Sequence, residues 1–312
     1  MAELNKPQRT FCNLPFCADL AELEADVAVL GAPHGTPYKL GTASHAAGAP
    51  AAVRGALDWY SADPAQFDFD AMTAVFGGAR VADCGDVRGD LRDGPANRER
   101  IREAVGEILA QGAVPLLLGG DDSVPIPLFE AYASRGKGKL GIVQIDAHID
   151  WRDEIGGERY GYSSTMRRAS ELDHVSGLVQ VGARGPGSAR ARDLADAQAW
   201  GAHIFPAREV HAKGLAPALQ AVPKGAEIIL SIDVDGIDPG VVPGVMLPAF
   251  GGLGYQQVLD VIHGVAARAT IVGAAFVEYV PERDPAGLGA QAIARLASNV
   301  IAAVGAQNSQ AG

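Results

Sequence analysis

The sequence predicts an α/β protein with three layers, in which helices cover both faces of a central parallel β-sheet. Short apolar runs alternate with longer amphipathic segments along the 312-residue chain, and this alternation is typical of repeated strand–helix units. The apolar runs are nearly continuous, as in Pro-Leu-Leu-Leu at 115–118, which indicates strands that are buried on both faces. No linker, repeat or low-complexity segment divides the chain. We therefore expect one domain over residues 1–312, with residues 1–20 as an N-terminal arm.

The alternation assigns each element a place in the chain. The strands are expected at 27–31, 80–84, 114–119, 140–146, 178–182, 226–233 and 271–278. The helices are expected at 47–60, 96–111, 125–134, 189–200, 255–267 and 286–304. Glycine-rich turns, such as those at 185–187 and 251–252, are too short to separate domains.

The composition is globular and acidic. With 48% hydrophobic and 20% charged residues, the chain has enough apolar material for a buried core. A formal net charge of −11 argues against nucleic acid or an anionic membrane as a partner and is compatible with a cationic ligand. Three cysteines are too few for a disulfide framework and fit a reducing compartment. Because the sequence has no signal-peptide pattern and no uninterrupted apolar stretch of membrane-spanning length, we expect a cytoplasmic protein.

Carboxylates gather where two of the expected strands end. One strand leads into Asp146, His148 and Asp150, and another leads into Asp233 and Asp235. Residues two positions apart on an extended chain share a face, so each set can project together. The crevice beyond the carboxyl ends of parallel strands is where ligands bind in such sheets. We therefore expect both sets in one site.

Four carboxylates in one place repel one another unless cations compensate them. A pair of divalent ions would do so, and oxygen with imidazole donors suits manganese, iron, nickel or zinc. A metal-free binding protein would leave the cluster unexplained. A lone aspartate after a strand is usually a turn or cap residue, and this is expected for Asp83, Asp86 and Asp238. The other histidines have no comparable setting and are expected to be structural: His34, His45, His174, His203, His211 and His263.

These motifs resemble those of the ureohydrolase family, which comprises arginases, agmatinases and related amidinohydrolases. The similarity runs nearly end to end, and this chain looks like a divergent agmatinase-like member. Its most specific segments are Gly-Gly-Asp-Asp-Ser at 119–123, Asp-Ala-His-Ile-Asp at 146–150 and Ser-Ile-Asp-Val-Asp-Gly-Ile-Asp-Pro at 231–239. The resemblance implies an arginase-like α/β/α sandwich. It also implies hydrolysis of a guanidine to an amine plus urea, with two manganese ions or, in some members, nickel.

The resemblance also implies roles for individual residues. The metal ligands would be Asp122, Asp146, His148, Asp150, Asp233 and Asp235. Both metals would share Asp146 and Asp233. Glu278 resembles the carboxylate that grips the guanidinium group, and Asp150, Tyr162 and Glu278 would be the catalytic side chains.

Three positions depart from the family pattern. Asp122 stands where the family has a metal-binding histidine, which adds a negative charge to one metal site. Tyr162 stands where the family often has a proton-shuttling histidine, and a phenol is a poorer shuttle at neutral pH. The polar Gly-Thr-Gly-Thr-Pro loop of the family is Gly-Val-Met-Leu-Pro at 244–248, so Val245, Met246 and Leu247 are expected to form an apolar substrate-binding wall.

The departures leave two interpretations open. In one, the protein is an amidinohydrolase whose pocket favours a guanidinium with a compact apolar substituent over arginine. In the other, it is a catalytically weak or inactive structural subunit beside an active paralogue, as in heteromeric members of the family such as metformin hydrolase. The expected partners are accordingly a small cationic guanidine and either further copies of the chain, in a trimer or hexamer, or a paralogue.

Overall fold

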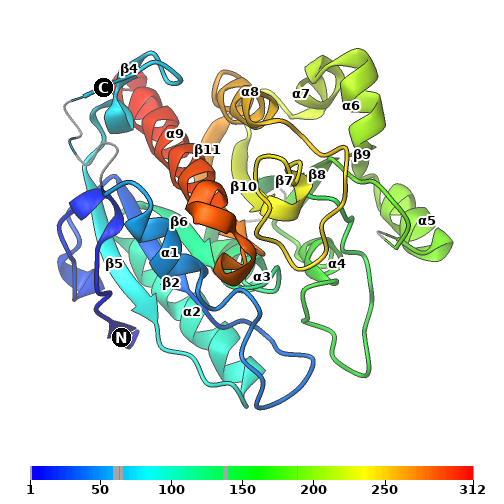
Figure 1. The fold of residues 1–312 in the computed structure, drawn as a ribbon, viewed down its shortest axis with the longest axis horizontal. Helices are drawn as coiled ribbons and strands as arrows, with labels where there is room; N and C mark the ends of the chain where they lie inside the picture. Colours follow the sequence, from blue (N-terminus) through cyan, green and yellow to red (C-terminus); the bar gives the residue numbers. More distant parts are fainter. Residues whose placement is uncertain (1, 59–62, 64–65, 136–139, 188, 312) are drawn as a thin grey trace.

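In the computed structural model, a nine-stranded sheet forms the centre of the molecule (Figure 1). The structure describes residues 2–58, 63, 66–135, 140–187 and 189–311. The strand order is β1-β5-β2-β6-β11-β10-β7-β8-β9, and all neighbours are parallel except the antiparallel pair of β1 and β5. The strands are β1 (Leu4–Asn5), β2 (Val27–Ala32), β5 (Val81–Val87), β6 (Val114–Gly119), β7 (Leu140–Ile145), β8 (Val175–Val181), β9 (His203–Phe205), β10 (Glu227–Asp233) and β11 (Thr270–Val277).

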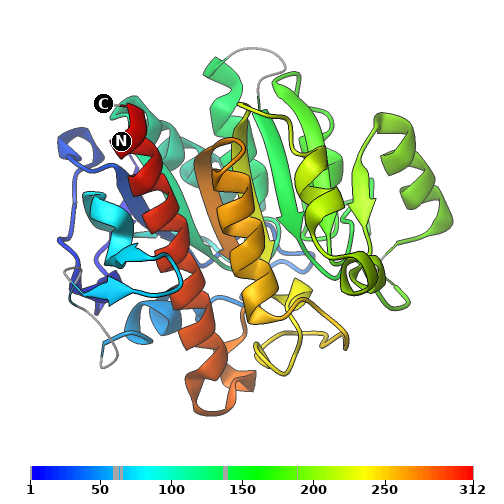
Figure 2. The same cartoon turned by 90° about the horizontal axis from the view of Figure 1, so that it is seen from above.

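Helices cover both faces of this sheet, which confirms the three-layer α/β fold. One apolar core includes side chains of α1 (Ala49–Gly55), α6 (Ala207–Lys213), α7 (Ala216–Ala221), α8 (Tyr255–Ala266) and α9 (Leu288–Ala311). The core on the opposite face includes side chains of α2 (Gly94–Ala110), α3 (Pro125–Glu130), α4 (Thr165–Ala169) and α5 (Ala191–Trp200). Figure 2 shows α8 and α9 lying side by side on their face of the sheet.

The local sequence explains where these elements begin and end. In β2 and β7 every residue is buried, as expected for strands with helices on both sides. Helix α2 begins where the side chain of Asp93 accepts a hydrogen bond from the Ala96 N–H, at 2.9 Å, and Pro95 occupies the first turn. Shortly after its end, Gly112 takes a φ of 76°, which favours glycine.

The sequence located the long elements and missed the short ones. All seven expected strands and all six expected helices are found. Strand β6 has the expected bounds and the other elements have shifted ends. Residues 59–60 of the first expected helix lie outside the described part of the chain. The missed elements are β1, β9, α4, α6, α7 and a hairpin of β3 (Phe67–Asp68) and β4 (Thr73–Ala74). The 3₁₀ turns are η1 (Phe11–Asn13), η2 (Leu20–Glu22), η3 (Val75–Gly78), η4 (Ala131–Arg135), η5 (Val234–Gly236), η6 (Pro281–Arg283) and η7 (Pro285–Gly287). The single domain with an N-terminal arm stays a prediction.

The C-terminal helix is unusually long and apolar. The stretch Pro285–Ser309 is long and apolar enough to cross a membrane by length and composition alone. However, 72% of its most apolar 18-residue window is buried inside the protein, where α9 packs on α1, α8 and β11. This burial is typical of the core helix of a globular domain.

Candidate metal centre

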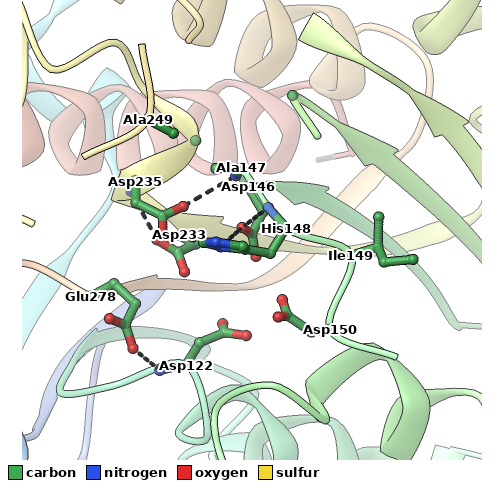
Figure 3. Close-up of polar contacts among 12 residues, drawn as sticks. Asp122, Asp146, Ala147, His148, Ile149, Asp150, Asp233, Asp235, Ala249 and Glu278 are labelled. Atoms are coloured by element: carbon green, nitrogen blue, oxygen red, sulfur yellow. Dashed lines mark hydrogen bonds and ion pairs between the residues drawn. The ribbon is translucent and has the colours of Figure 1, made fainter. Parts of the chain in front are cut away.

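The carboxyl ends of four neighbouring strands bring the candidate residues together. The strands β6, β11, β10 and β7 are adjacent in the sheet and parallel, so their carboxyl ends meet at one edge. Asp122 lies in the loop after β6, and Glu278 follows β11 directly. The remaining candidates follow β10 and β7: Asp233, Asp235, Asp146, His148 and Asp150. Figure 3 shows these side chains grouped around a common space.

Two groups of three side chains are compact enough to hold a metal ion. Ligand atoms of Asp146, His148 and Asp235 lie within 4.8 Å of one another, and so do those of Asp122, Asp146 and Asp233. Asp146 belongs to both groups, as expected of a ligand between two ions, whereas Asp233, for which the same role was expected, belongs to one group only. Asp150 belongs to neither group, although it lies beside them (Figure 3).

The group with the imidazole already contains its own ion pairs. The Nδ1 atom of His148 is 3.2 Å from Asp146 Oδ1 and 3.2 Å from Asp235 Oδ2. Burial lowers the pKa of His148, but the Asp235 hydrogen bond and nearby carboxylates outweigh it and raise the pKa to about 9. Burial raises the pKa of Asp235, but the hydrogen bond and charge of His148 bring it below its usual value. This group is partly neutralised from within.

The other group has no cation. Asp122 is 1% exposed. When Asp122 and Asp150 are both ionised, neither carboxylate oxygen of Asp122 has a hydrogen-bond partner among the described residues. Burial, followed by repulsion from neighbouring carboxylates, raises the pKa of Asp122, Asp146 and Asp233 well above the usual value. Leaving buried charge uncompensated is costly. A divalent cation among these oxygens would satisfy the orphaned atoms, so the residues present fit a metal.

A buried chain of amides holds two of the carboxylates together. The Nε2 of Gln144 donates to Asp146 Oδ2 at 2.6 Å and to Asp150 Oδ2 at 2.7 Å. The Oε1 of Gln144 accepts from Gln180 Nε2 at 2.5 Å, and Trp151 Nε1 donates to Gln180 Oε1 at 2.9 Å. The contact with Gln180 orients the Gln144 amide so that its NH2 group faces the two carboxylates. The shared donor holds Asp150 next to Asp146. Neither glutamine could be predicted as part of the site, because both occur within apolar strand runs.

Two site residues have strained backbones. Asp150 has a φ of 49° and Glu278 a φ of 69°, a region that side chains other than glycine seldom occupy. Such a residue costs on the order of 1–3 kcal/mol. The surrounding hydrogen bonds hold both conformations, since Arg167 N–H donates to the Asp150 carbonyl at 3.0 Å and Glu278 N–H donates to the Gly120 carbonyl at 2.9 Å.

A cavity of about 190 Å³ opens over the cluster. The candidate residues in its lining are His148, Asp150, Tyr162, Asp233, Asp235 and Glu278. Met246 and Leu247 line it from the loop after β10, and Arg152 lines it with its charge paired to Asp193 at 2.6 Å. Val245 does not line it, because this residue is 1% exposed and packs in the hydrophobic core. Of the three residues expected to form an apolar wall, Met246 and Leu247 therefore line the cavity.

Two arginines fix the loop that carries this wall. Arg283 Nη1 donates to the Met246 carbonyl at 2.5 Å. Arg184 Nη2 donates to the carbonyls of Asp235 at 2.6 Å and Ala249 at 2.8 Å, and so joins a metal-ligand candidate to the same loop. These contacts give the loop a defined position over the cluster.

Glu278 has a partner that the sequence analysis assigned to a structural role. One oxygen, Oε1, accepts the Asp122 N–H at 2.9 Å, and the other, Oε2, lies 2.5 Å from His45 Nε2. The His45 ring meets the edge of Tyr162 at a centroid distance of 5.5 Å. Burial raises the pKa of the Tyr162 phenol further above its usual value, so it stays protonated. His45 and Glu278 lie 233 positions apart, and no local pattern in the sequence marks their pairing.

Comparison with known proteins agrees with this geometry. Residues 25–303 match the arginase family. The chain is 32% identical to guanidinobutyrase of Pseudomonas aeruginosa over 89% of this chain and 86% of that protein. It is 36% identical to a mitochondrial agmatinase of Gallus gallus over 69% of this chain, an alignment that spans 64% of that protein's length.

Solved structures share the architecture. A hypothetical agmatinase from Burkholderia thailandensis superposes with a TM-score of 0.81 at 27% identity, covering 97% of this chain and 92% of that one. Proclavaminate amidino hydrolase from Streptomyces clavuligerus superposes with a TM-score of 0.80 at 25% identity, covering 97% and 98%.

Proposed function

Because the chain belongs to the arginase family, we propose that it is a metal-dependent amidinohydrolase that cleaves a guanidine compound to an amine plus urea. The observation that carries the proposal is the paired metal-ligand geometry at the sheet edge, with Asp146 common to both groups. The names of guanidinobutyrase and agmatinase among the relatives support a guanidino substrate. Manganese or nickel is the proposed metal, since carboxylate and imidazole ligands suit both.

The two groups of side chains suggest which residues would hold each ion. Asp146, His148 and Asp235 would hold one ion, and Asp122, Asp146 and Asp233 the other. We include Asp150 in the second site because Gln144 holds it against Asp146. When bound, a divalent pair lowers the pKa of a coordinated water and thereby supplies a nucleophile near neutral pH.

The remaining side chains would bind and orient the substrate. Glu278, buried at the cavity, would accept hydrogen bonds from the guanidinium and hold its carbon over the carboxylates. Asp150 lines the same cavity and could accept a proton from the attacking water. Tyr162 would donate a hydrogen bond rather than carry a proton, because its phenol stays protonated. The reaction consumes one water molecule and yields urea and a protonated amine, which carries the positive charge of the guanidinium.

The cavity supports a small substrate. Its volume of about 190 Å³ is below the roughly 300–1,000 Å³ of pockets that take drug-sized ligands. Met246 and Leu247 offer no partner to the α-carboxylate and α-amine of arginine, and the charge of Arg152 in the lining is already paired with Asp193. Each buried polar group left unpaired costs about 1–3 kcal/mol. We therefore expect arginine to be about 10–100-fold poorer than a guanidine with a compact apolar substituent.

A screen for urea release tests the proposal. The protein, loaded with manganese or nickel, is assayed against guanidine, methylguanidine, agmatine, guanidinobutyrate, arginine and alkylated biguanides, with Glu278→Gln as the inactive control. Arginine as the best substrate would contradict the apolar-wall argument. If no guanidine yields urea from the fully loaded protein, the hydrolase proposal fails for the isolated chain.

The specific observation that favours a second function is Asp122 in the all-carboxylate group. That function is a structural subunit of a heteromeric amidinohydrolase. It predicts no urea release alone and a gain of activity or solubility when a catalytic paralogue is added. Measuring the mass of the purified chain with and without the paralogue distinguishes a homo-oligomer from a hetero-oligomer.

A further inference from the structure

The imidazole of His45 contacts the carboxylate of Glu278. His45 lies in the loop between β2 and α1, and its Nε2 approaches Glu278 Oε2 to 2.5 Å. The Asp122 N–H occupies the other oxygen, so both oxygens of this carboxylate already have a partner. A guanidinium that binds Glu278 must therefore share or displace the imidazole.

The pair is held in place from several directions. The His45 side chain is 21% exposed and that of Glu278 is 7% exposed, so solvent screens their interaction weakly. Tyr162 packs edge-on against the His45 ring and against Tyr38, at centroid distances of 5.5 and 4.6 Å. The Tyr38 hydroxyl in turn accepts the Ser163 N–H at 3.1 Å. The imidazole is thus a fixed neighbour of the carboxylate.

From this geometry we infer that His45 is a positioning residue that competes with substrate for Glu278, so that binding of a guanidinium expels a proton from the imidazole. The inference rests on the proposed function, in which Glu278 receives the guanidinium. His45 itself does not line the cavity and acts through Glu278, which does.

The charges around His45 set the direction of the effect. The groups facing it are Glu278, Asp121, Arg283 and Tyr162. Burial lowers the pKa of His45, but the hydrogen bond and charge of Glu278 raise it more, Asp121 adds to the rise, and Arg283 opposes it. A guanidinium on Glu278 cancels the charge that sustains this rise, so the pKa of His45 falls when substrate binds. By linkage, affinity for the cation decreases as the pH falls through the pKa of His45 in the free protein.

Two substitutions separate positioning from titration. His45→Gln places a neutral amide donor near the position of Nε2, so it keeps the hydrogen bond to Glu278 but cannot release a proton. His45→Ala removes both the hydrogen bond to Glu278 and the proton that could be released. The matched control is His263→Gln on α8, whose Nε2 lies 3.0 Å from Asn299 Oδ1, remote from the cluster in sequence and fold.

Calorimetric titration of the manganese-loaded protein with methylguanidine, at several pH values and in two buffers of different ionisation enthalpy, measures protons released per ligand bound. We expect wild type and His263→Gln to release a substantial fraction of one proton near neutral pH and to bind more weakly as pH falls. His45→Gln should bind with an affinity that changes little over the same range and release close to none. His45→Ala should bind within about tenfold of wild type and also release close to none.

Each outcome decides between the proposals. Equal proton release by wild type and His45→Gln overturns the role of His45 and leaves the hydrolase proposal intact. Binding with the expected proton release but without urea formation overturns only the hydrolase proposal. Failure of metal-loaded wild type to bind methylguanidine or any other guanidine overturns both.

Discussion

The two halves of the metal centre share Asp146 but balance charge in opposite ways. Around His148, the imidazole lies 3.2 Å from both Asp146 and Asp235 and supplies a positive charge from within the chain. Around Asp122, both carboxylate oxygens are buried and, with Asp122 and Asp150 ionised, have no hydrogen-bond partner among the described residues. The carboxylates of the His148 half thus have a cationic partner within the chain, whereas those of the Asp122 half would gain one only from a bound metal ion. We therefore expect the Asp122 half to depend on metal more strongly than the His148 half.

Removing the Asp233 carboxylate should break the centre most severely. Asp233→Asn replaces a charged ligand of the Asp122 half with a neutral amide, which can still accept the Asp235 N–H that lies 2.8 Å from Asp233 Oδ1. We expect the ion of the Asp122 half to be lost and urea release to fall by roughly a thousandfold, about 4 kcal/mol of transition-state stabilisation. Metal content and kcat measure this loss. The control Asp260→Asn, on the exposed side of α8, should leave both unchanged; retention of two ions by Asp233→Asn would contradict the assignment.

Removal of metal by a chelator should destabilise the fold. Binding that occurs only in the folded state contributes about 2.7 kcal/mol when the free metal is at 100 times its Kd, so we expect Tm to fall by roughly 5 °C or more. Thermal unfolding with and without manganese measures the shift. An unchanged Tm would mean that the buried carboxylates are compensated in some other way.

Cutting the amide chain should weaken metal binding without removing a ligand. Gln144→Met deletes the donor to Asp146 and Asp150 while keeping a similar volume. Loss of such a supporting contact typically costs 10–100-fold in metal affinity, and we expect a loss in that range. Gln307→Met on α9, which deletes backbone contacts at Ala266 and Ala269 instead, is the matched control. Equal affinities in the two variants would exclude a role for the amide chain.

The smallest effect is expected from a substitution that makes the two halves of the centre more alike. Asp122→His gives the all-carboxylate group an imidazole and removes one negative charge. Nickel or zinc should then bind the second site about tenfold or more tightly, because imidazole suits these metals better than a further carboxylate. Titration of the second ion compares the variant with wild type, and an unchanged affinity would refute the asymmetry.

The parts of this centre that sequence could predict are those that follow directly from strand ends. Asp146 and Asp233 were predicted because each comes at the end of a buried apolar strand, where a carboxylate is out of place in a core. His45 could not be predicted, since its contact with Glu278 depends on how two loops 233 residues apart fold together. The short strand β9, with three residues at the sheet edge, was missed because so few residues carry no periodic pattern. Val245 was predicted to line the pocket because it lies in the loop at 244–248. It faces the core instead, and only the fold decides which side chains of a loop do so.

The most direct test of the paired centre is anomalous diffraction from crystals of the protein grown with manganese. The account predicts two manganese peaks per chain, one among Asp146, His148 and Asp235 and the other among Asp122, Asp146 and Asp233. A structure with saturating manganese and no peak in the Asp122 group would contradict it.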